Sequence, residues 1–216
     1  MAARRYPFDA GRAVAALRRS DPALGRAIDT FGPFTMRRRA MRTPFEALLR
    51  AIVYQQLSGR AAGAIHARVL ALFEGGRPTA RTLAAMSDDA LRATGLSRAK
   101  TAAARDLAEK TIARVVPGGR ALRDMPDDEI VARLIQVRGV GRWTAEMLLM
   151  SHLARPDVLP ATDLGIRRGF ARVQGLEELP EPADLLAHGE RWRPWRTVAS
   201  WYLWRAADLT AGIPED

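Results

Sequence analysis

The sequence predicts an all-α protein, because the signals that begin and end helices recur along the chain while strand-like alternation is scarce. Residues that favour helix N-caps stand before apolar runs of helical length, and glycines follow many of these runs. The connections between the runs are short, with no internal repeat and no low-complexity linker. A chain of 216 residues has room for one domain or for two intertwined lobes.

The first clear helix start lies at Thr43. Pro44 follows it at the first helical position, and Glu46 stands three residues after the cap, which predicts a capping box before the run LLRAIVYQQ. Ser58 is expected to cap a second helix, which ends at the glycine pair 75–76.

Further helices follow in the middle and at the end of the chain. Ser87 opens a short helix that Gly95 closes, and Ser97 begins a long one that reaches about Ala113 and is separated from the next by the glycines at 118–119. The remaining helices are expected over about 126–137, 141–154, 163–172, 182–190 and 194–209.

The charge balance indicates a polyanionic partner. The formal net charge is +10, and a surplus of this size favours binding to phosphates. Only Lys100 and Lys110 are lysines, so 34 − 2 = 32 of the basic residues are arginine. Arginine binds phosphate through two parallel hydrogen bonds, but a codon preference would produce the same bias, so the arginine count alone decides nothing.

Several classes of site are excluded or disfavoured by composition. The chain has no cysteine, which excludes disulfides, thiolate nucleophiles, cysteine-ligated zinc and iron–sulfur clusters. The three histidines, His66, His152 and His188, lie far apart in the sequence, which disfavours a histidine metal site. No apolar run reaches the ~20 residues that span a bilayer, and the segment MAARRYPF has no export signal. We therefore expect no membrane association and a cytoplasmic, nucleoid-associated protein.

The segment LIQVRGVGRWTAEMLLM, residues 134–150, carries the most information. It predicts a helix, a tight turn at Gly139-Val140-Gly141 and a second helix whose amide N–H groups form a phosphate site. The triplet alone is more often a purely structural turn. The whole string is more specific, because a large residue and the pair Thr144-Ala145 follow the turn.

This segment resembles the hairpin of the helix-hairpin-helix DNA glycosylase superfamily, which includes endonuclease III. LPATDLGIRRGF at 159–170 resembles the aspartate loop of that superfamily. RAIVYQQLSGRAAGAIHARV at 50–69 and ERWRPWRTVASWYLWRAAD at 190–208 are similar to the 3-methyladenine DNA glycosylase II family, the AlkA type. The resemblance covers about residues 20–210.

The resemblance implies a two-lobed all-α fold with the active site in the cleft between the lobes, and without most of the AlkA N-terminal β domain. The whole chain, 1–216, would form one glycosylase unit. About residues 45–155, including the hairpin, would form a central lobe, and the N-terminal helices together with 156–216 would form the second lobe.

Asp163 is the catalytic residue that the resemblance implies. By local sequence alone it reads as a helix N-cap, since aspartate is a favoured cap and Thr162 precedes it. In the family, this carboxylate faces the sugar of a flipped nucleotide, where it stabilises an oxocarbenium-like transition state or orients water.

The residue after Arg142 sets the expected reaction subtype. Glycosylase-lyases of the superfamily have a lysine there that forms a Schiff base, whereas this chain has Trp143. Water is then the expected nucleophile, with no cleavage of the strand. The resemblance places Trp143, Met147, Trp204 and Tyr54 around the base, and an aromatic face favours a cationic alkylated base.

Other residues are implied to hold the DNA. By the resemblance, Gln56, followed by Leu57, occupies the position that fills the gap left by an extruded base. From the residues alone, Gln56 is nearly as well explained as an exposed polar residue at a helix end. Gly139, Gly141, Arg142 and Thr144 are expected at the phosphates. Backbone carbonyls of Ile135, Val137 and Val140 would hold a monovalent cation, Na⁺ or K⁺, and no other cofactor is expected.

Three functions remain open at this point. The leading expectation is hydrolytic release of alkylated bases such as 3-methyladenine and 7-methylguanine from double-stranded DNA by a monomer. A related enzyme could act on another lesion, such as 1-methyladenine or ethenoadenine. A non-catalytic helix-hairpin-helix module that recognises distorted DNA is the third, and in that case Asp163 is only a helix cap.

Overall fold

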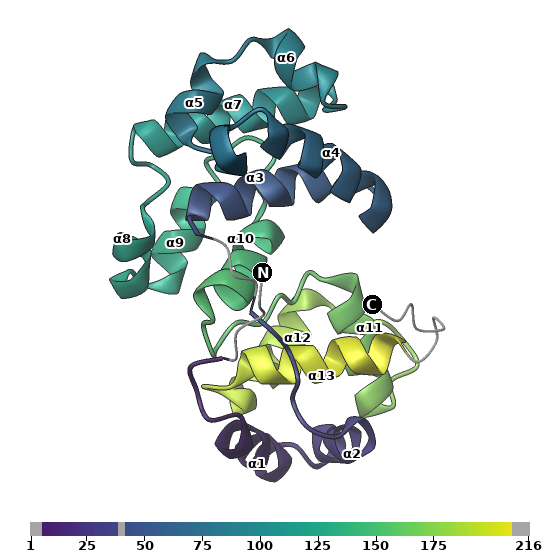
Figure 1. The fold of residues 1–216 in the computed structure, drawn as a ribbon. Coiled ribbons are helices and arrows are strands. Elements are labelled where there is room, and N and C mark those ends of the chain that lie inside the picture. The colour runs from purple at the N-terminus through teal and green to yellow at the C-terminus, as the bar shows by residue number, and fades with distance from the viewer. Residues whose placement is uncertain (1–5, 39–41, 209–216) are drawn as a thin grey trace. The chain divides into compact units, whose positions relative to one another are not determined.

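A computed structural model describes residues 6–38 and 42–208 of the chain. Within these ranges it contains thirteen α-helices, two short 3-10 turns and one π-helical turn, and no β-strand (Figure 1). The predicted all-α class is confirmed. No helix in these ranges is long and apolar enough to cross a membrane. The segment examined for an export signal begins outside the described residues.

The chain divides into two compact units. The terminal unit comprises Met1–Ala40 and Leu149–Asp216, and the central unit comprises Met41–Leu148.

The terminal unit is built on α11 and α13, which pack closely against each other, with α1 and α2 also against α13 (Figure 1). Its elements are α1 (Ala10–Ser20), α2 (Pro22–Phe31), the π-helical turn Leu149–Leu153, α11 (Leu164–Gln174), α12 (Pro182–Gly189), the 3-10 turn Glu190–Trp192 and α13 (Arg196–Asp208).

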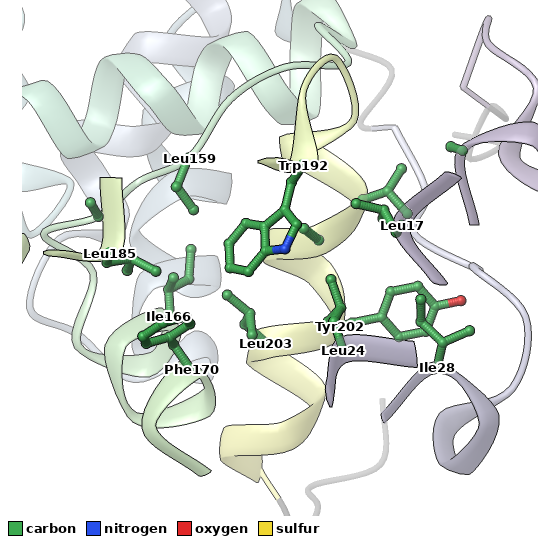
Figure 2. Packing of buried hydrophobic residues seen from close by; sticks show 14 residues of the cluster. Leu17, Leu24, Ile28, Leu159, Ile166, Phe170, Leu185, Trp192, Tyr202 and Leu203 are labelled. Carbon is green, nitrogen blue, oxygen red and sulfur yellow. The ribbon is translucent and has the colours of Figure 1, made fainter. Parts of the chain in front are cut away.

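An apolar core holds this unit together. Figure 2 shows Trp192 at its centre, with leucines from α1, α2, α12 and α13 around the indole. Trp192 is fully buried, and its indole N–H donates to Asp21, the N-cap of α2, at 3.0 Å. Trp195 and Trp201 pack against the same core, so all three tryptophans serve packing.

The central unit is organised around α7, which packs against α3, α5 and α6. Its elements are α3 (Pro44–Tyr54), α4 (Gly59–Ala71), the 3-10 turn Glu74–Gly76, α5 (Ala80–Ala85), α6 (Asp88–Ala93), α7 (Arg98–Ile112), α8 (Gly119–Asp124), α9 (Asp127–Leu134) and α10 (Arg142–Leu148).

The predicted N-caps of this unit are confirmed. Thr43, Ser58, Ser87 and Ser97 each accept a hydrogen bond from the amide N–H three residues later. The capping box is only half formed, because the Glu46 carboxylate accepts from the amide of Arg42 instead of that of Thr43.

One predicted helix end was wrong, and two other helices differ from their predictions only in detail. The helix expected over 126–137 ends at Leu134, because residues 135–141 form the turn that leads into α10. The helix expected over 141–154 ends in the π-helical turn Leu149–Leu153. The last helix begins at Arg196 and is described to Asp208, so Leu209 lies outside the described residues.

Candidate functional site

Asp163 lies at the N-terminus of α11 and is the N-cap of that helix. Its Oδ1 accepts the amide N–H of Ile166 at 2.9 Å, and its backbone is fixed by a bond from its own amide to the Pro160 carbonyl at 2.9 Å. The interpretation of Asp163 as a cap is therefore correct as far as local structure goes. A cap and a catalytic carboxylate are compatible roles, since the N-terminal end of a helix stabilises an ionised carboxylate.

A second donor comes from α13. The indole Nε1–H of Trp204 donates to the same Oδ1 of Asp163 at 3.0 Å. Trp204 was expected as a wall of the base pocket, which stays a prediction. The structure shows its indole N–H as a hydrogen-bond donor to the carboxylate. The two donors fix the rotation of the Asp163 side chain.

Two glycines of α11 make this arrangement possible. A Cβ on Gly165 would lie 3.0 Å from Oδ1 of Asp163 and 3.1 Å from Cδ1 of Trp204. A Cβ on Gly169 would lie 1.8 Å from the backbone carbonyl oxygen of Leu203 on α13. The absence of side chains at these positions lets α11 and α13 approach closely enough for Trp204 to reach Asp163.

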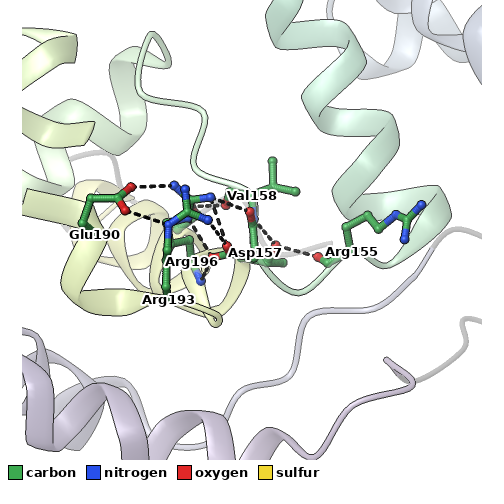
Figure 3. Close-up of polar contacts among 8 residues, drawn as sticks. Arg155, Asp157, Val158, Glu190, Arg193 and Arg196 are labelled. Atoms are coloured by element: carbon green, nitrogen blue, oxygen red, sulfur yellow. Dashed lines mark hydrogen bonds and ion pairs between the residues drawn. The ribbon is translucent and has the colours of Figure 1, made fainter. Parts of the chain in front are cut away.

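The segment that leads to Asp163 is fixed to the start of α13 by a polar network (Figure 3). The Arg196 guanidinium donates to Asp157 Oδ1 at 2.7 Å and to the Asp157 carbonyl at 3.1 Å. Thr197 donates to the Arg155 carbonyl at 2.7 Å and accepts the amide of Val158 at 3.1 Å. Asp163 is therefore held between two anchored segments, α13 and the stretch before the aspartate loop.

In the central unit, the hairpin consists of α9, a turn over residues 135–141, and α10. Gly139 has φ +76°, in the left-handed region where glycine is favoured, whereas Gly141 does not have positive φ. A Cβ on Gly141 would meet no atom within 4 Å, so this backbone is open to approach. The predicted turn is present, and only its first glycine is needed for its conformation.

The side chains after the turn differ in exposure. The Arg142 guanidinium donates to the buried Glu146 carboxylate at 2.9 Å, one turn further along α10. Thr144 is buried, so a phosphate contact from this residue would come from its backbone amide. Trp143 is 45% exposed, and Met147 follows it on the same face of the helix.

Tyr54, the last residue of α3, is already stacked. The Arg50 guanidinium carbon lies 3.7 Å from the centre of the Tyr54 ring, and the His66 ring lies edge-on at 5.8 Å. One face of Tyr54 therefore already holds a cation. A positively charged base would not be expected to stack on that face.

Gln56 lies in the connection between α3 and α4, and its side chain is exposed together with that of Leu57. It has φ +55°, a left-handed conformation that is uncommon outside glycine. The neighbouring Gln55 donates through Nε2 to the Gly139 carbonyl at 2.8 Å, which joins this connection to the hairpin turn.

The three carbonyls expected to hold a cation all belong to the turn after α9. The Val137 carbonyl accepts the amide of Val140 at 3.0 Å, which leaves it the capacity for one further contact. Neutral carbonyl oxygens suit a hard cation. Within the described residues, no group of three His, Cys, Asp or Glu side chains is arranged to hold a metal ion.

Four positions that matter here were missed by the sequence analysis: Gln55, Lys100, Gly165 and Gly169. The glycines carry no signal in a single sequence that separates close helix packing from chance. Lys100 entered the sequence analysis only as one of the two lysines.

Comparisons with known proteins show the family of the chain. Residues 49–194 match the HhH-GPD superfamily of base excision DNA repair proteins. The chain is 38% identical over 169 residues to DNA-3-methyladenine glycosylase 1 of Schizosaccharomyces pombe, which covers 78% of this chain and 74% of the relative.

Solved structures give the same result. A DNA-3-methyladenine glycosidase from Bacillus halodurans matches with a TM-score of 0.87 and 34% identity, over 96% of this chain and 94% of the other. The 3-methyladenine DNA glycosylase of Schizosaccharomyces pombe, in complex with abasic DNA, matches with a TM-score of 0.79 and 36% identity, over 90% and 95%. The resemblance seen in the sequence is thereby confirmed, and the chain belongs to the HhH-GPD superfamily of base excision DNA repair proteins, in which its homologues are DNA-3-methyladenine glycosylases.

Proposed function

We propose that this protein is a monofunctional DNA glycosylase that hydrolyses the N-glycosidic bond of alkylated bases in base excision repair. The observation that carries the proposal is the Asp163 carboxylate, held at the N-terminus of α11 by the Ile166 amide and the Trp204 indole. An ionised group fixed in one orientation suits a reaction in which positive charge develops on the sugar.

In the proposed reaction, the bond between C1′ and the base nitrogen breaks and the base leaves with the electron pair. Water then forms a new bond to C1′ and loses a proton, which gives an abasic site and a free base. Asp163 stabilises the oxocarbenium-like transition state or orients this water. Alkylation at a ring nitrogen gives the base a positive charge and makes it a better leaving group.

Hydrolysis without strand cleavage is supported by the contacts that the two lysines make. A lyase needs an amine nucleophile, and Trp143 stands at the position where lyases of the superfamily carry one. The ammonium groups of Lys100 and Lys110 both donate to backbone carbonyls of the central unit. Neither is placed as a nucleophile, which supports water in that role.

The proposed substrates are 3-methyladenine and 7-methylguanine in double-stranded DNA, bound by a monomer at the nucleoid. Trp143, with Met147 beside it, supplies the aromatic face for a cationic base, and Trp204 and Tyr54 are proposed as further walls. Since Arg50 occupies one face of Tyr54, we assign the cation contact to Trp143. The same walls would accept 1-methyladenine or ethenoadenine.

We further propose that Gln56, with Leu57, fills the gap left by the extruded base. Amides of Gly139, Gly141 and Thr144, with the Arg142 side chain, would contact the backbone phosphates. A monovalent cation on the carbonyls of Ile135, Val137 and Val140 would add positive charge at the same phosphates.

The test is base release from methylated duplex DNA by the wild type and by Asp163→Asn, with freed bases and strand integrity measured together. The asparagine retains a carbonyl that accepts both hydrogen bonds, so the fold and the cap are expected to persist. We expect release of methylpurines with unbroken strands from the wild type, and at least about a thousandfold slower release from the variant. Tight DNA binding by the wild type without release would instead favour the non-catalytic module.

A further inference from the structure

The two lysines of the chain lie on the same helix, α7, and both bind backbone carbonyls of other elements in the central unit. Lys100 Nζ donates to the carbonyls of Val53 and Gln55, each at 2.7 Å. Lys110 Nζ donates to the carbonyl of Gln136 and to the carboxylate of Asp106. An ammonium group is compact and has three donors, so it can serve two converging acceptors, which a planar guanidinium does less well.

Lys100 stabilises the C-terminal end of α3. The last carbonyls of a helix lack partners within the helix and carry the negative end of its dipole, which favours a cation there. Burial lowers the pKa of Lys100, so holding the cation at this point has a cost in free energy. The two carbonyls supply hydrogen-bond acceptors for the ammonium group. One of them belongs to Gln55, the residue directly before Gln56.

Gln56 needs such support because its backbone is strained. Its φ of +55° is unfavourable for a residue with a side chain and persists only where the surroundings fix it. The contacts that fix this backbone are made by Gln55. Its backbone carbonyl accepts a hydrogen bond from Lys100, and the Gln55 side chain donates to the Gly139 carbonyl at 2.8 Å.

The hairpin turn is fixed to the same helix. Asp106 Oδ2 accepts the amide of Arg138 at 2.6 Å, and Lys110 binds the carbonyl of Gln136. A Cβ on Gly139 would lie 3.4 Å from the Cβ of Ala103, so α7 and the turn are in close contact.

We propose that α7 fixes the position of the wedge loop (residues 55–57) relative to the hairpin turn (residues 135–141), because both bind to it. Within this arrangement, Lys100 is the positioning residue for Gln56. This relative position matters because the hairpin binds phosphates while the wedge loop enters the base stack of the same DNA. This inference rests on the proposed function, since it takes Gln56 as the wedge.

The experiment measures wedge insertion without turnover. The probe is a duplex with a tetrahydrofuran analogue of an abasic site opposite 2-aminopurine, whose fluorescence at saturating protein reports unstacking. Affinity is measured for this duplex and for an intact one. The variants are Lys100→Met, the matched control Lys110→Met on the same helix, and Gln56→Ala as the reference for a lost wedge.

We expect Lys100→Met to lose most of the fluorescence change, as Gln56→Ala does, and to lose about tenfold in its preference for the abasic duplex. Lys110→Met should retain the fluorescence change at saturation and bind both duplexes more weakly by a similar factor. Lys100→Arg keeps the charge, but its planar guanidinium serves two converging carbonyls less well, so it should lose part of the fluorescence change. If the melting temperature shows that Lys100→Met does not fold, the same measurements are made on Lys100→Arg.

The proposal is overturned if Lys100→Met keeps the fluorescence change of the wild type. If that variant also binds both duplexes more weakly by the same factor, Lys100 contributes only its positive charge to DNA binding. Absence of the change in the wild type would overturn it as well. A wild type that inserts the wedge but releases no methylpurine would refute the proposed function and leave the positioning result in place.

Discussion

The surroundings of Asp163 and those of Gln56 are held in place by different means. Asp163 sits on a helix whose neighbour approaches so closely that Gly169 has no room for a Cβ, and its carboxylate receives an indole N–H. Gln56 lies on an exposed connection whose backbone is fixed by ammonium and amide groups bound to carbonyls.

The difference follows from the tasks that we propose for the two regions. A carboxylate that stabilises developing charge must keep its position to a fraction of an ångström, and close packing of two helices gives that rigidity. A side chain that enters a base stack must be exposed, so packing cannot hold it and charged hydrogen bonds must do so. The packing and polar contacts of the unit that holds Asp163 can be tested by three measurements, which run from the largest expected effect to the smallest.

The close packing of α11 against α13 is tested by Gly169→Ala. The added Cβ meets the backbone carbonyl of Leu203, which cannot rotate away as a side chain could. We expect the free energy of unfolding to fall by about 3 kcal/mol, measured by urea denaturation.

The control for this substitution is Gly59→Ala on α4 of the central unit, where an added Cβ meets no atom within 4 Å. It should leave stability unchanged or raise it by at most about 1 kcal/mol, since alanine favours a helix over glycine. Equal stability of the two variants would contradict the close approach of α11 and α13.

The indole donor is tested by Trp204→Phe. The substitution retains an aromatic ring but removes the N–H that donates to Asp163, and we expect base release about tenfold slower at saturating DNA. Trp201→Phe is the matched control, because Trp201 packs its ring against Phe34 in the same unit. If the two variants lose activity equally, Trp204 contributes through the packing of its ring and not through its N–H group.

The smallest effect is a pH dependence of stability in the terminal unit. Burial by itself would raise the pKa of Asp21, but hydrogen bonds from His188, the Leu24 amide, Trp192 and Gln174 outweigh it and lower this pKa below its ordinary value of 3.8. Because the folded-state pKa is lower, the stabilisation is complete above pH 3.8 and is lost as the pH falls through the folded-state value.

The measurement is the free energy of unfolding of the wild type and of Asp21→Asn from neutral pH to pH 3. As the pH falls through the acidic part of this range, the free energy of unfolding should decrease more for the wild type than for the variant. The difference between the two free energies should therefore become smaller. Parallel curves would show that Asp21 does not titrate differently in the folded and unfolded states.

The local chemistry of the chain determined much of the fold. N-caps at Thr43, Ser58, Ser87 and Ser97 are correct, because a cap depends on a side chain and an amide only three residues apart. The hairpin turn is correct for the same reason, since Gly139 permits the left-handed conformation that the turn requires. The α5 and α8 helices have six residues each and were not predicted, since such short segments show little periodicity. The equally short α6 was predicted only from Ser87 and Gly95 at its ends.

The sequence by itself therefore determined the helical class, the family and the position of Asp163, because these depend on local patterns and on the order of motifs. Only the tertiary structure decided what holds the proposed site residues. Trp204 lies 41 residues from Asp163, and Lys100 lies 45 residues from Gln55. Contacts over such separations depend on how helices pack, and no local pattern encodes which side chain will reach which acceptor.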